Sequence, residues 1–128
     1  MSTASLRARY LGNSIATASP QQLLVMLYDR LALDLERGQA ALEAGDKLGA
    51  EPHLKHAQEI VLELRACLKV ELWDGAPRLA ALYSWLLTEL IAANVKGDLR
   101  RVRDCQRIVE PLRDAWRQAA ASLAVSSA

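Results

Sequence analysis

Apolar residues recur at steps of three and four along most of the chain, and only short breaks interrupt this spacing. Such steps place apolar side chains on one face of an α-helix. Breaks containing glycine, aspartate or proline, at 45–46, 73–77 and 97–98, separate four helical stretches. Short connections force neighbouring helices to run antiparallel. The sequence therefore predicts an all-α fold, an antiparallel four-helix bundle.

Turn and capping residues mark where these helices begin and end. Ser19 and Pro20 are typical of a helix N-terminus, and Gln22 completes a capping-box pattern. We expect four helices, at 20–45, about 50–70, 77–95 and 98–123. The chain then divides into an extended or short-helical N-terminal lid segment at 1–18, a bundle at 19–123 and a frayed tail at 124–128.

Composition excludes several classes of protein. Of the 128 residues, 52% are hydrophobic and 24% charged, too many apolar residues for a disordered chain and too many charges for a bilayer. The net charge of +1 gives no general attraction to nucleic acid. The most apolar stretch, Leu79–Val95, contains Glu89 and is shorter than the roughly 20 residues that span a bilayer. Without a signal peptide either, we expect a cytoplasmic protein with no nucleic-acid partner and no membrane insertion.

The sequence offers few residues for catalysis. His53 and His56 lie three apart on one predicted helix, without the glutamate spacing of a di-iron bundle. A zinc site would need Glu59 or Glu63 as a further ligand, whereas polar histidines on a solvated helix face are far more common. No glycine-rich phosphate loop or Ser-His-Asp arrangement is present. We therefore expect no enzyme, no metal and no cofactor, with a histidine phosphotransfer or signalling bundle as the alternative.

The third predicted helix holds more apolar residues than a bundle needs. From Leu79 to Val95, 13 of 17 residues are apolar, whereas a bundle helix needs about three positions in seven. One interpretation is a central helix covered by the N-terminal segment. Another is a hydrophobic groove that accepts an amphipathic helix of a partner. The same face could also join two copies of the chain in a homodimer.

A resemblance to a known family rests on several motifs. Tyr10 and the run from Ile15 to Asp29 resemble the N-terminal signature of the FliS family, the flagellin-specific export chaperones of bacteria. Similar residues recur at 82–83, at Leu90, and at 93–94 and 112–116. The sequence departs from the family at Arg30, where glycine is common, and at Pro111 in the last helix. The resemblance implies a chaperone that binds the disordered C-terminal region of flagellin, prevents premature polymerisation and supports delivery to the flagellar type III secretion apparatus.

The resemblance also implies where partners would bind. Tyr10 and Ile15 would be lid or partner contacts. The third predicted helix and its neighbour would supply the other contacts: Leu82, Tyr83, Leu86, Leu90, Ala93, Asn94, Leu112 and Trp116. The implied partners are the flagellin C-terminal segment and the flagellar export gate.

Overall fold

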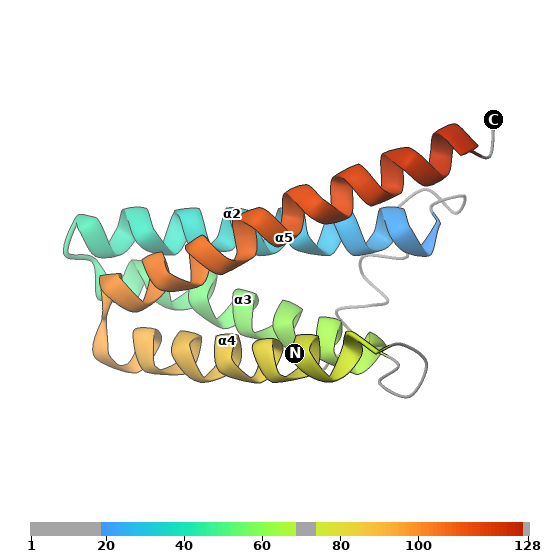
Figure 1. Ribbon diagram of the computed structural model, residues 1–128. Coiled ribbons are helices and arrows are strands. Elements are labelled where there is room, and N and C mark those ends of the chain that lie inside the picture. Colours follow the sequence, from blue (N-terminus) through green and yellow to red (C-terminus); the bar gives the residue numbers. More distant parts are fainter. Residues whose placement is uncertain (1–18, 69–73, 127–128) are drawn as a thin grey trace.

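The computed structural model describes residues 19–68 and 74–126, which form four helices (Figure 1). These are α2 (Pro20–Glu43), α3 (Lys47–Cys67), α4 (Ala76–Lys96) and α5 (Leu99–Ser126). Helices α2 and α4 each pack against both α3 and α5, so α2 and α4 lie diagonally opposite in the bundle. The predicted antiparallel four-helix bundle is confirmed. The predicted lid at 1–18 lies outside the described residues.

Side-chain caps determine where two of the helices begin. The Ser19 hydroxyl accepts a hydrogen bond from the Gln22 backbone N–H at 3.1 Å, and the Gln22 side chain accepts one from the Ser19 N–H at 2.8 Å. The predicted capping box is therefore present at α2. At α3 the Asp46 carboxylate accepts a hydrogen bond from the Gly49 N–H at 2.8 Å. Because Asp46 caps the helix, α3 begins at 47, earlier than the predicted position near 50.

Glycines with positive φ make the two tight turns of the described chain. The φ angles of Gly45 and Gly97 are 74° and 63°, in the left-handed region that other residues adopt only at a cost. Gly97 is the C-cap of α4, and its N–H donates back to the last turn of that helix. The chain then reverses into α5, which continues through Pro111 to Ser126, past the expected end at 123.

The core is built from one buried face of each helix, and it is almost entirely aliphatic. Helices α2 and α3 approach closely at Gly38, where an added Cβ atom would lie 2.8 Å from Cδ2 of Leu54. Two carboxylates, Asp34 and Glu63, are buried with these apolar side chains. No helix in the described part of the chain has the length and apolarity needed to cross a membrane.

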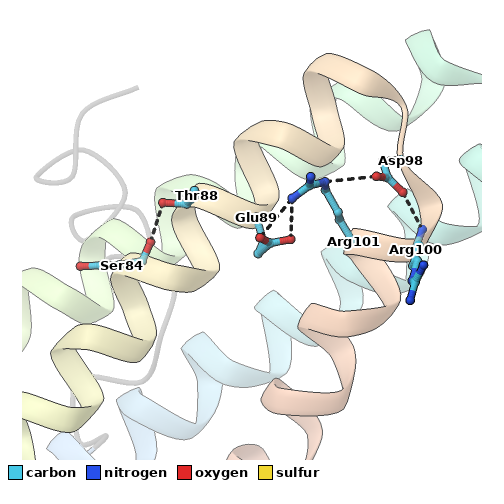
Figure 2. Close-up of polar contacts among 6 residues, drawn as sticks. All are labelled: Ser84, Thr88, Glu89, Asp98, Arg100 and Arg101. Atoms are coloured by element: carbon cyan, nitrogen blue, oxygen red, sulfur yellow. Dashed lines mark hydrogen bonds and ion pairs between the residues drawn. The ribbon is translucent and has the colours of Figure 1, made fainter.

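Helix α5 crosses the bundle rather than following one neighbour. It starts beside the C-terminal end of α4, passes across α2 in the view of Figure 1, and its last turns extend beyond α2. At its start, Arg101 donates two hydrogen bonds to the Glu89 carboxylate of α4, at 3.0 and 3.1 Å, and one to Asp98 at 3.1 Å (Figure 2). These contacts hold the start of α5 against α4. Among the described residues, the start of α4 and the C-terminal half of α5 border an apolar groove.

Candidate partner-binding groove

An apolar groove lies between the first turns of α4 and the C-terminal half of α5. Its cavity volume is about 360 Å³. The residues that line it are Gly75, Arg78, Leu79, Leu82, Leu112, Ala115, Trp116 and Ala119. Arg78 is the one charged residue in this lining. A concave surface of this composition can bind apolar side chains of a partner, with Arg78 placed to pair with a carboxylate at the edge.

Ion pairs with α2 hold the α5 wall of the groove in place. Arg113 Nε donates to Asp29 Oδ1 at 2.7 Å, and the Arg117 guanidinium donates to the same oxygen at 2.8 Å. Trp116, between these two arginines in sequence, packs against Tyr28 of α2 with ring centroids 6.3 Å apart. The C-terminal half of α5 is therefore fixed to α2, which keeps it away from the start of α4.

Two buried tyrosines lie beneath the groove wall and connect α2 to α4. The hydroxyl oxygens of Tyr28 and Tyr83 are 2.8 Å apart and share a hydrogen bond. Burial raises the pKa of Tyr28, and the hydrogen bond with Tyr83 acts in the opposite direction. The pKa of Tyr83 is raised far above its usual value, first by burial and then by Tyr28. Both hydroxyls therefore stay protonated and serve as a neutral link across the bundle.

The predicted partner contacts fall into separate places. Leu82, Leu112 and Trp116 come together in the groove lining. Four others are instead buried in the bundle core, each exposed by 1% or less: Tyr83, Leu86, Leu90 and Ala93. A helix that is apolar on nearly all sides does not reveal from its sequence which face the core covers. A direct contact between a partner and these four side chains would require the bundle to open.

The remaining predicted contacts lie away from the groove. Asn94 lies at the far end of α4, where it lines a hollow of about 300 Å³ together with Lys47, Leu48, Glu51 and Val95. Since Gly97 closes α4 through its backbone, Asn94 is not the C-cap residue. Tyr10 and Ile15 lie outside the described residues.

Sequence reasoning missed part of the groove. Ala115 and Ala119 of α5 line it, as does Leu79 of α4. A signal for the α5 wall was present, because residues 112, 115, 116 and 119 follow helical spacing on one face. The two alanines are small and exposed. From the sequence alone, this face of α5 is therefore predicted to be exposed to solvent, because the position of α4 beside it is not known.

One of the two histidines, His56, takes part in a contact between two helices. His56 of α3 bonds through Nδ1 to the fully buried carboxylate of Asp34 on α2. Arg30 Nε lies 3.4 Å from the other oxygen of that carboxylate. In residues 19–68 and 74–126 no group of three or more His, Cys, Asp or Glu side chains could hold a metal ion. The Asp34–His56 pair therefore joins α2 to α3 inside the bundle.

Comparison with known proteins decides the family. The model of the family described as flagellar protein FliS matches residues 2–123. The chain belongs to the FliS family. The flagellar secretion chaperone FliS of Bacillus subtilis is 32% identical over 110 residues, covering 86% of this chain and 82% of that protein. The FliS proteins of Vibrio cholerae and Escherichia coli K12 are each 30% identical, covering 83% of this chain and 79% of theirs.

A solved structure shares the FliS-family fold. It is described as the crystal structure of a flagellar chaperone from bacteria, and it superimposes with a TM-score of 0.73 at 20% identity. The match covers 93% of this chain and 98% of that one. The chain is thus a four-helix member of a family of flagellar secretion chaperones, which are not enzymes. Family membership leaves the phosphotransfer alternative without support.

Proposed function

We propose that this chain acts in the cytoplasm and binds the disordered C-terminal region of flagellin in the groove between α4 and α5. Binding would hide surfaces through which flagellin polymerises and would keep the subunit ready for the flagellar type III export gate. The groove itself is the observation that carries the proposal, because it is the apolar hollow whose lining includes predicted contacts from both α4 and α5.

The shape and chemistry of the groove favour a helical segment as the guest. Both walls are helices, and the lining offers Leu82, Leu112 and Trp116 as apolar contacts between small alanines. A disordered segment that folds as it binds can present apolar residues at helical spacing to such a groove. It also pays an ordering cost, which keeps the complex reversible, as delivery to an export gate requires.

The other predicted contacts take different roles in this proposal. Tyr10 and Ile15 belong to a lid segment that competes with the guest or adds to its contacts. The four buried residues of α4 support the groove from the core side. Asn94 would be reached only by a guest that continues along α4 beyond the groove, to the hollow at its far end.

Calorimetry with a C-terminal flagellin peptide tests the proposal. We expect a 1:1 complex with a negative heat-capacity change, which is the signature of buried apolar surface. Ala115→Glu should weaken binding roughly tenfold or more, because the bound peptide would cover the added carboxylate with apolar side chains and remove its hydration. Ala115 is exposed, so this substitution leaves the core untouched.

Ala121→Glu is the matched control, because Ala121 is exposed on the same helix but is not part of the groove lining. It should bind the peptide as the unmodified chain does. A dissociation constant weaker than about 100 µM for the unmodified chain would sink the proposal. Equal losses of affinity in the two variants would show that the peptide does not bind in the groove.

A homodimer, which the sequence also allowed, requires a different surface if flagellin occupies the groove. If flagellin and a second copy used the same surface, each would exclude the other. If they use different surfaces, a substitution in the groove should weaken flagellin binding and leave dimerisation unchanged.

A further inference from the structure

The outward face of α4 is uncharged over four turns. Between 81 and 95 every exposed residue of this helix lacks a charge. Three of them are large apolar residues, Trp85, Ile91 and Val95, with exposed fractions of 39%, 45% and 65%. Surface helices of soluble domains normally present charged or polar residues on the opposite side from the core. A continuous apolar strip of this kind is typical of a surface that another molecule covers.

Two polar side chains of this part of α4, those of Thr88 and Glu89, already have hydrogen-bond partners. The Thr88 hydroxyl donates to the Ser84 backbone carbonyl of its own helix at 3.0 Å (Figure 2). On the flank facing α5, Glu89 is held by Arg101. Covering the strip therefore leaves neither of these two side chains without a partner.

We propose that a second copy of the chain covers this strip, with the two α4 helices antiparallel and a twofold axis passing next to Thr88. In that arrangement each residue lies opposite the one that is equally distant from Thr88 in the other direction. Trp85 of one copy then lies at the level of Ile91 of the other, and Val95 at the level of Ala81. The large apolar side chains of Trp85 and Ile91 therefore meet twice, once on each side of the axis, and the small Ala81 leaves room for Val95. The strip thus packs apolar groups against apolar groups in a contact that is the same for both copies, as a twofold interface requires.

Charge at the two ends of the strip fits the same arrangement. Arg78 and Asp98 lie equally far from Thr88 along the chain, so antiparallel pairing brings Arg78 of one copy to the level of the Asp98 turn of the other. The C-terminal end of α4, just before that turn, carries partial negative charge from its unpaired carbonyls. Arg78 is exposed, and a cation is stabilised next to such a helix end. A parallel pairing would instead bring the two Arg78 side chains together.

Sedimentation of the full chain at several concentrations tests whether the dimer exists. We expect reversible monomer–dimer behaviour. Ile91→Glu should raise the dimer dissociation constant roughly tenfold or more, because it places an unpaired carboxylate in an apolar contact. Leu123→Glu is the control, since Leu123 of α5 is exposed to a similar extent, 47%, but lies off the strip. Circular dichroism checks that both variants remain helical.

Cross-linking tests the position of the axis. In a Cys67→Ser background, Thr88→Cys should form a disulfide-linked dimer under mild oxidation, because the two Thr88 residues face each other at the axis. Ser84→Cys should not, since the two copies of Ser84 would be about 12 Å apart along the helices at 1.5 Å per residue. Buried Cys105 is not available for cross-linking in the folded chain.

Each contrary result overturns the proposal in a recognisable way. A chain that remains monomeric at about 200 µM has no such dimer, since that concentration detects even weak self-association. Equal sedimentation of the Ile91→Glu and Leu123→Glu variants moves the interface off α4, and equal cross-linking at 84 and 88 excludes the twofold axis. If the chain is monomeric and its Ile91→Glu variant loses flagellin binding, the strip binds the export substrate and not a second copy. A dimer linked at 88 that fails to bind flagellin refutes the proposed function alone.

Discussion

The hydrogen bond between Tyr28 and Tyr83 allows a quantitative test of how the bundle is held together. The two hydroxyls lie in the core, 2.8 Å apart, and join the diagonally opposed helices α2 and α4. Changing one tyrosine to phenylalanine leaves the other hydroxyl buried without its partner. Such an unpaired group costs about 1–3 kcal/mol of unfolding free energy.

The double variant, Tyr28→Phe with Tyr83→Phe, should behave differently from the sum of the single variants. It removes both polar groups together, and a matched apolar replacement costs about 1 kcal/mol or less. A coupling free energy of about 1–3 kcal/mol between the two positions should result. In thermal unfolding this separates double variant and sum by roughly 4 °C per kcal/mol for a chain of this size.

Urea unfolding of the four chains at pH 7 measures the cycle, and repeating it at high pH adds a second readout. Burial raises the pKa of both tyrosines above the ordinary value of 10.0. Their contribution to stability is therefore fully present below pH 10 and falls as the pH rises further, since the unfolded chain ionises first. The double variant should lose this part of the alkaline dependence. Additive single effects would refute the idea that the two hydroxyls act as a pair.

Three further predictions concern stability. Burial, with smaller effects from neighbouring carboxylates, raises the pKa of Cys105 from 9.0 to about 12. The free energy of unfolding should therefore fall as the pH rises between these two values, and it should fall less steeply in Cys105→Ala. An equal dependence on pH in the two chains, measured by urea unfolding, would contradict this. Asp34→Ala should cost about 1–3 kcal/mol in urea unfolding, because it removes the buried carboxylate that bonds to Nδ1 of His56. A loss below about 0.5 kcal/mol would show that the pair is dispensable. Gly97→Ala should lower the unfolding free energy by about 1–2 kcal/mol because of its φ of 63°. Gly45→Ala should cost no more than Gly97→Ala. At Gly45, with a φ of 74°, an added Cβ would have no neighbouring atom within 4 Å, whereas at Gly97 it would also meet the Lys47 side chain at 3.2 Å. A larger loss of stability at Gly45 in thermal unfolding would refute this reasoning.

The fold was predictable because its signals are local. The Ser19 capping box, the glycine turns and the spacing of apolar residues each depend on residues a few positions apart, and the structure has them where the sequence indicated. The early start of α3 was missed because a single aspartate cap at 46 outweighs the apolar pattern that begins later.

The candidate site was predictable only in part, because it depends on how two helices diverge. Leu82, Leu112 and Trp116 were placed in the groove, whereas Leu86 and Leu90 are core residues of the same apolar helix. The ion pairs that draw α5 towards α2 join residues more than 80 positions apart in sequence. The sequence pattern holds no information about such pairs, so the position of the groove could not be derived from it.

The oblique course of α5 also affects how a guest segment would alter the whole molecule. Within residues 19–68 and 74–126, the divergence of α5 from α4 leaves an apolar groove of about 360 Å³ beside the start of α4. A helix seated there would complete the apolar packing of the bundle and become part of its hydrophobic core. Binding and folding would then be thermodynamically coupled. At a guest concentration a hundred times the dissociation constant, the free energy of unfolding of the bundle would rise by about 2.7 kcal/mol. The chaperone would be most stable while loaded and would become easier to unfold once its cargo had left.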